Sequence, residues 1–133
     1  MKKYFLFIAL AFCLQTNAQD SSKIVYPLVI SFESHCCDVP SDSVIRKFIN
    51  AYKKQQKIKS LTAVRIGPMG REGEYYLAFR LGEIKKKKQQ DFITRISQLK
   101  PLTTDRGSFS FREKMEIDAS SLSQRTKQKT VVF

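Results

Sequence analysis

The stretch from Leu28 to Tyr52 constrains the fold of this chain more than any other. It starts inside an almost wholly apolar run, Ile24–Phe32, which is typical of a strand buried on both faces of a sheet. The polar loop Glu33–Pro40 follows, and Ser41 is placed to cap a helix that runs to about Gln56. That helix has one apolar face, formed by Val44, Ile45, Phe48, Ile49 and Tyr52. The stretch therefore predicts a strand–loop–helix unit.

Two strands joined by an exposed hairpin loop are predicted next. Leu61–Ile66 is rich in residues that favour strands, and Tyr75–Leu81 alternates between two faces with a period of two. Between them, Gly67–Glu74 holds three glycines and a proline, which are typical turn residues. We expect this loop to expose the side chains of Met69, Arg71 and Glu72.

A second helix and a fourth strand complete the pattern. Apolar residues on one face predict a helix over Glu83–Leu99, which Pro101 ends. Ser108–Asp118 alternates as a strand, except that Glu113 falls on the apolar face, where we expect a bulge or an end-of-sheet position. Residues 119–133 are rich in Ser, Gln and Lys and are predicted to form a flexible tail, whose last three residues could dock as a short strand.

The element order β-α-β-β-α-β predicts a ferredoxin-like α+β fold, because it is the order of the split βαβ unit. In that fold both helices cover one face of a four-stranded antiparallel sheet, whose strands lie in the order fourth, first, third, second. The two most apolar strands, Ile24–Phe32 and Tyr75–Leu81, would then be central. A single domain over residues 19–118 is long enough to bury a core. The sheet face without helices would bind a partner or be covered by the tail.

Residues 1–18 are predicted to be a secretory signal peptide. A basic start precedes the apolar run Tyr4–Leu14, which is shorter than the about 20 residues that span a bilayer. Thr16 and Ala18 are small, which predicts cleavage between Ala18 and Gln19. We therefore expect a periplasmic or secreted protein of a bacterial cell envelope, with no transmembrane segment in the mature chain.

The mature chain is strongly basic, with 22 Lys and Arg residues against 12 Asp and Glu residues and a net charge of +10. Such a surface attracts anionic lipid headgroups, acidic glycans or acidic proteins, and an exported protein rarely meets nucleic acid. The lysines around the end of the first helix and the start of the second could form one patch that binds an anionic surface. They are Lys53, Lys54, Lys57, Lys59, Lys85, Lys86, Lys87 and Lys88. The simpler interpretation is a solvated positive face.

Reactive side chains gather in the first loop at His35, Cys36 and Cys37. Two thiols and an imidazole are ligands for Cu(I) or Zn(II), although adjacent residues cannot easily direct both sulfurs at one ion. The nearby helix N-terminus would lower the pKa of a thiol. In an oxidising compartment the cysteines could instead close a vicinal disulfide or link to another chain, or one of them could enter the core. Small metal-carrying domains of the same topology hold a Cys-x-x-Cys pair in this loop, but here the cysteines are adjacent, so no metal role is transferred.

No motif of a hydrolase or a nucleotide-binding enzyme accompanies these residues. The favoured hypothesis is a small exported, non-enzymatic binding module without a cofactor, whose partner is an envelope protein or an anionic surface. The alternative is a thiol-dependent protein that binds copper or zinc, or senses redox state, through the His-Cys-Cys loop. A role as a peptidase inhibitor or a chaperone-like prodomain fits the size and topology, and a homo-oligomer is compatible with an exposed sheet face.

Overall fold

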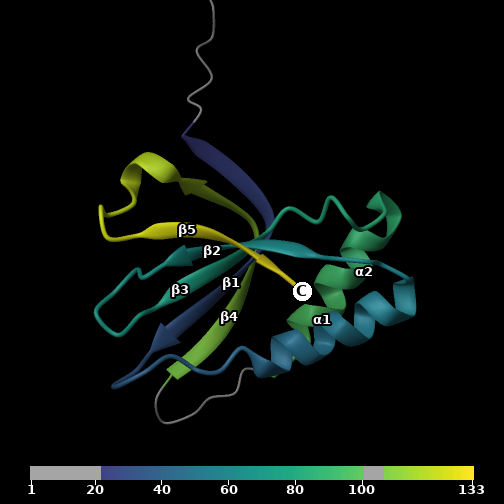
Figure 1. Cartoon of the computed structure of the whole chain (residues 1–133), viewed down its shortest axis with the longest axis horizontal. Helices are drawn as coiled ribbons and strands as arrows, with labels where there is room; N and C mark the ends of the chain where they lie inside the picture. Colours follow the sequence, from purple (N-terminus) through teal and green to yellow (C-terminus); the bar gives the residue numbers. More distant parts are fainter. Residues whose placement is uncertain (1–21, 101–106) are drawn as a thin grey trace, which may run out of the picture.

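The computed structural model describes residues 22–100 and 107–133, and it contains a five-stranded antiparallel sheet and two α-helices (Figure 1). In chain order the elements are β1 (Lys23–Ser34), α1 (Ser43–Gln56), β2 (Thr62–Gly67), β3 (Tyr75–Phe79), α2 (Lys86–Ser97), β4 (Gly107–Asp118), the 3-10 turn η1 (Ala119–Ser121) and β5 (Lys127–Val132). No helix within these described residues is long and apolar enough to cross a membrane. The predicted signal peptide lies outside them.

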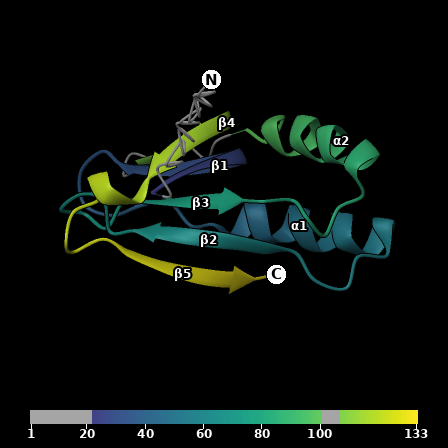
Figure 2. The ribbon, with the colours of Figure 1, turned by 90° about the horizontal axis from the view of Figure 1, so that it is seen from above.

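The predicted α+β class is confirmed, but the predicted number of strands is wrong. The strands lie in the order β4-β1-β3-β2-β5 (Figure 2), so the first four keep the predicted order and a fifth is added beside β2. Part of the predicted flexible tail is therefore a strand, in which Val131 pairs with Ala63. The next residue, Phe133, stacks on Phe79 with 6.0 Å between ring centroids and exchanges backbone hydrogen bonds with Leu61.

Both helices share one hydrophobic core with the sheet. Tyr52 of α1 and Phe92 of α2 meet edge to face, with 5.0 Å between their centroids, and Phe79 of β3 lies beside Phe92. These side chains are almost fully buried, and each such burial stabilises the fold by about 2 kcal/mol. The other sheet face has a smaller cluster around Tyr26 and Ile66. Its apolar side chains are largely buried, and Leu122 of the predicted tail packs against them, which agrees with the second of the two expectations for this face, that the tail would cover it.

β1 and β4 change faces where Pro27 lies opposite Lys114. Leu28 faces the core shared with the helices, whereas Tyr26 belongs to the cluster on the other face. The ladder pairs Leu28 with Glu113, but Pro27 and Lys114 themselves form no registered pair, and Lys114 has a φ of 51°. The predicted irregularity at Glu113 is thus found one residue further on. Pro27 opposes it because proline has no N–H to give to the ladder.

Both helices begin later than predicted. Asp42, not Ser41, is the N-cap of α1 and forms an ion pair of 2.8 Å with Arg46, while the Ser41 hydroxyl accepts from the N–H of Ser43 at 3.2 Å. α2 begins at Lys86 instead of Glu83. The Glu83 carboxylate is engaged elsewhere, because it accepts the N–H of Thr62 at 2.9 Å.

Candidate functional site: a lysine-lined hollow between the helices

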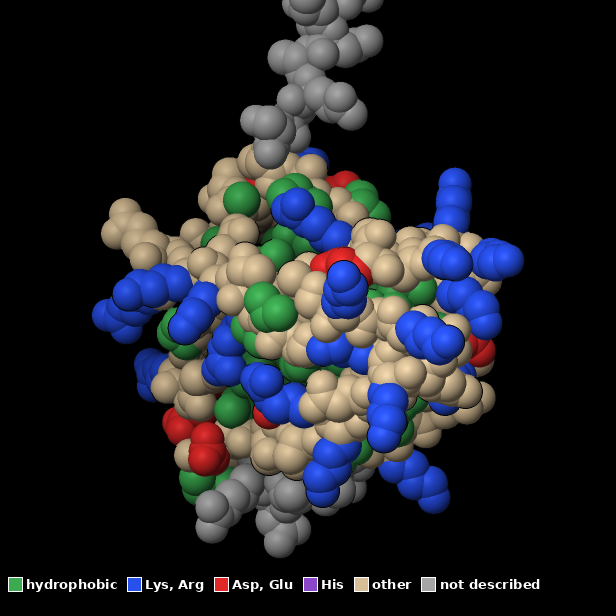
Figure 3. Space-filling model, turned by 45° about the vertical axis from the view of Figure 1, so that its right-hand side comes forward, with side chains coloured by type: hydrophobic (Ala, Val, Ile, Leu, Met, Phe, Trp, Pro, Cys, Tyr) green, Lys and Arg blue, Asp and Glu red, His purple; other side chains and the backbone are tan. Residues whose placement is uncertain are grey.

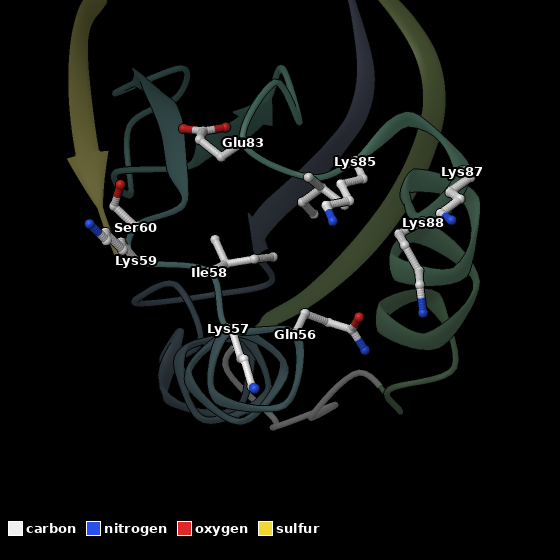
Figure 4. Close-up of a pocket in the computed structure, with 10 residues that line it drawn as sticks. Gln56, Lys57, Ile58, Lys59, Ser60, Glu83, Lys85, Lys87 and Lys88 are labelled. Atoms are coloured by element: carbon white, nitrogen blue, oxygen red, sulfur yellow. The ribbon is translucent and has the colours of Figure 1, made fainter.

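A hollow of about 480 Å³ lies between the end of α1 and the start of α2 (Figure 4). Five lysines and a single acidic residue line it. The lining residues are Gln56, Lys57, Ile58, Lys59, Ser60, Glu83, Ile84, Lys85, Lys87 and Lys88. Its volume falls in the range of about 300–1,000 Å³ that is usual for sites of small ligands. We name this feature the lysine hollow.

One wall of the lysine hollow is formed where α1 ends. Lys57 adopts the left-handed conformation, with a φ of 54°, and its N–H points back to the carbonyls of Lys53 and Lys54. The N–H of Ile58 then bonds to the Lys53 carbonyl at 2.9 Å. This turn brings the half-buried side chain of Ile58 against the core and leaves the Lys57 ammonium at the surface (Figure 4). A helix end of this kind normally carries glycine, because side chains disfavour the left-handed region.

The opposite wall is the N-terminus of α2. Lys85 is the N-cap residue, no side chain caps the first turn, and the turn contains no acidic residue. The positive end of the helix dipole therefore adds to the charges of Lys87 and Lys88. Gln89 fixes the chain that enters this turn, because its side-chain amide donates to the carbonyls of Leu81 at 2.9 Å and Ile84 at 3.1 Å. These two hydrogen bonds fix the backbone that carries Lys85, Lys87 and Lys88.

The lysine hollow has a net positive charge that other side chains do not neutralise. Glu83 directs its carboxylate to the start of β2, where it accepts from both the N–H and the hydroxyl of Thr62. In residues 22–100 and 107–133, no acidic side chain forms an ion pair with any lysine that lines the hollow. Figure 3 shows Lys and Arg side chains spread over the neighbouring face, with few acidic ones among them. An anionic group would be attracted here, most strongly at low ionic strength.

The structure brings together five of the eight lysines predicted to bind an anionic surface: Lys57, Lys59, Lys85, Lys87 and Lys88. The other three lie outside the lysine hollow. Lys53 donates to the Phe133 carbonyl, and Lys54 and Lys86 are exposed on their helices. Sequence reasoning missed the uncharged lining residues, because a residue such as Gln56 or Ser60 gives no signal until the two helix ends are placed side by side.

The His-Cys-Cys loop has a different geometry from the one expected of a metal site. Cys36 and Cys37 are exposed, with their sulfur atoms 2.6 Å apart, so adjacency does not keep the two sulfurs from meeting. His35 points elsewhere, because its Nε2 lies 3.2 Å from the hydroxyl of Ser108. Within the described residues, no group of three or more His, Cys, Asp and Glu side chains is arranged to hold a metal ion.

The expectation of a lowered thiol pKa in this loop is wrong for Cys37. Its hydrogen bond to Cys36 raises the pKa of the Cys37 thiol, and desolvation and the negative charges of Glu72 and Asp38 raise it further. Glu72 belongs to the hairpin loop after β2, which lies at the same end of the sheet. A thiol in this environment is disfavoured as a thiolate, and the thiolate is the form that attacks substrates and binds metals.

The predicted hairpin loop is exposed at all three of its named positions, Met69, Arg71 and Glu72. Met69 and Arg71 line a second hollow, of about 590 Å³, together with Arg125 from the chain before β5. Glu72 does not line it. The loop therefore faces the segment that precedes the fifth strand, which sequence reasoning had assigned to a flexible tail.

A comparison of the chain with known protein families, curated proteins and solved structures finds no match.

Proposed function

We propose that this chain is a non-enzymatic binding module that takes up a compact anionic group in the lysine hollow. The observation that carries the proposal is that five lysines from two helix ends line one concavity, and that none of them forms an ion pair with an acidic side chain in the part of the chain that the structure describes. A merely solvated face would present its lysines outward and apart. Here Lys57 comes from the end of α1 and Lys88 from the first turn of α2, and both line the same hollow (Figure 4).

The ligand class follows from the chemistry of the lining. Ammonium groups bind phosphate, sulfate and carboxylate oxygens as point charges, and uncapped N–H groups at the start of α2 favour the same anions. Ile58 and Ile84 add an apolar part to the lining. A sulfated or phosphorylated group of another envelope component fits this lining better than a neutral ligand.

We further infer that the fold is a ferredoxin-like domain extended by a fifth edge strand, and that the protein is exported to the periplasm or secreted. The strand order of β4, β1, β3 and β2 supports the first inference. The basic, apolar and small-residue pattern of residues 1–18 supports the second. In that compartment anionic glycans, lipid headgroups and acidic proteins are the available partners.

The test compares two double variants that lose the same charge from the same two helix regions. Lys57→Gln/Lys88→Gln removes one ammonium from each wall of the lysine hollow, whereas Lys54→Gln/Lys86→Gln removes two that lie outside it. Binding of a heparin-derived sulfated oligosaccharide is measured by calorimetry at low salt, and binding to phosphatidylglycerol vesicles is measured in parallel.

We expect the hollow variant to bind the oligosaccharide about tenfold or more weakly, because two ammonium contacts of about 1 kcal/mol each are lost. The matched variant should change binding by less than about threefold, through its net charge alone. Equal losses in both variants would show that the charge acts as a diffuse positive face and would overturn the proposal. If the two variants differ in their binding to the vesicles but not in their binding to the oligosaccharide, the anionic group belongs to a lipid.

A further inference from the structure

We propose that Cys36 and Cys37 form a disulfide with each other, which makes the first loop a redox modification site separate from the lysine hollow. Their sulfur atoms lie 2.6 Å apart, and both residues are exposed to oxidants in solution. Bond formation shortens this separation to about 2.05 Å and closes a strained eight-membered ring across the peptide bond between the two residues. The side chains already point toward one another, so neither sulfur has to leave a buried position.

The backbone around the pair is anchored to the start of β4. Gly107 lies so close to the loop that a Cβ atom there would stand 2.4 Å from the Glu33 carbonyl oxygen and 3.2 Å from that of Asp38. On the other side of the glycine, the Ser108 hydroxyl bonds to His35. These contacts hold the chain just before and just after the two cysteines. The two cysteines are therefore held in one position relative to β4. Forming the disulfide ring between them costs little loop-closure entropy.

The surroundings of the pair favour a disulfide over the other uses of two thiols. Asp38 and Glu72 oppose a negative charge on Cys37, whereas a disulfide carries no charge. The imidazole of His35, which would be the third ligand of a metal site, is turned toward β4. A neutral product with no need for a third ligand fits both observations.

The step balances as ordinary thiol–disulfide exchange with a small disulfide oxidant, such as glutathione disulfide. One protein thiol loses its proton, and its sulfur attacks the oxidant and releases one glutathione thiol. The second protein sulfur then loses its proton and displaces the second glutathione, which carries away the electron pair of the mixed disulfide. Adjacent Cα atoms are about 3.8 Å apart, below the usual range for disulfides, so the bond should be reduced more readily than an ordinary structural disulfide.

The experiment uses the full chain with Cys13→Ser, so that Cys36 and Cys37 are the only thiols. The protein is equilibrated with defined mixtures of reduced and oxidised glutathione, quenched with acid, alkylated and analysed by intact mass. We expect a monomer lighter than the reduced protein by two hydrogen atoms, without alkylation, in oxidising mixtures. Reduced glutathione should return both thiols. The variants Cys36→Ser and Cys37→Ser should each carry one glutathione instead.

Three outcomes would overturn the proposal: two alkylated thiols in excess oxidised glutathione, a glutathione on each cysteine, or dimers linked by disulfides. Folding is checked on the same samples by circular dichroism, and the double variant Cys36→Ser/Cys37→Ser serves as the thiol-free reference. Because the cysteines do not line the lysine hollow, binding of the sulfated oligosaccharide should be the same in this reference. The two proposals can therefore fail separately.

Discussion

Lys87→Glu should make the protein more stable while it weakens anion binding. Lys87 is exposed in the first turn of α2, where no acidic residue offsets the positive end of the helix dipole. A charge in the first turn contributes about 0.3–1 kcal/mol, with a sign that depends on the charge. Replacing an unfavourable lysine with a favourable glutamate combines two such contributions, so we expect a gain of about 1 kcal/mol.

The gain is measured by urea unfolding at low salt and by thermal unfolding, where it corresponds to about 4 °C for a domain of this size. Lys86→Glu is the matched control, because Lys86 lies in the same turn but does not line the lysine hollow. Both variants should gain similar stability. Only Lys87→Glu should lose most of the affinity for the sulfated oligosaccharide.

Salt provides a second check, because the Debye length falls from about 10 Å at 0.1 M to about 3 Å at 1 M. The stability gain of both variants should shrink accordingly in concentrated salt. A Lys87→Glu variant that is no more stable than the parent at low salt would refute the dipole argument. A gain that does not depend on salt would assign the effect to helix propensity instead.

Three further substitutions test other parts of the structure. Lys57→Gly should stabilise the protein by about 1 kcal/mol in urea unfolding, because glycine adopts a φ of 54° without strain, whereas Lys57→Ala should not. Phe133→Ala should cost about 2 kcal/mol, since it removes the half-buried ring that stacks on Phe79, and an unchanged urea midpoint would show that β5 is not docked. Burial, with the charge of Asp42, raises the pKa of Tyr75 to about 12, above its value of about 10 in the unfolded chain. The neutral phenol thus contributes about 2 kcal/mol to the free energy of unfolding below pH 10, and this contribution is lost as the pH rises toward 12. When the free energy of unfolding is measured between pH 9 and pH 12, the Tyr75→Phe variant should lack this loss.

The order of β4, β1, β3 and β2 could be predicted from sequence, because strand alternation and apolar helix faces are local patterns. The pairing of β5 with β2 could not be predicted in this way. Its sequence, Lys127–Val132, is polar, since an edge strand exposes most of its side chains. What holds it is backbone pairing with β2 and the stacking of Phe133 on Phe79, and both partners are distant in sequence.

The candidate site was predictable in composition but not in geometry. The lysine runs are visible in the sequence, yet which lysine faces the lysine hollow depends on where each helix begins and ends. α2 starts at Lys86, and Glu83, which precedes it, accepts from the N–H of Thr62, a contact between residues 21 positions apart. The raised pKa of Cys37 likewise depends on Glu72, which only the folded sheet brings near the first loop.

The placement of two lysines supports the proposed binding hollow over a solvated face. Lys53 and Lys54 lie in the last turn of α1, where the negative end of the helix dipole favours cations. Two lysines of the hollow are placed against the same rules: Lys57 occupies a left-handed position that suits glycine, and Lys87 occupies a first turn that suits an acid. Lys86 shares that first turn outside the hollow, so Lys57 is the stronger of the two cases. Local choices that oppose the stability of the fold are characteristic of functional sites. If lysine were present here only for solubility, positions such as those of Lys53 and Lys54 would provide it without destabilising either helix end.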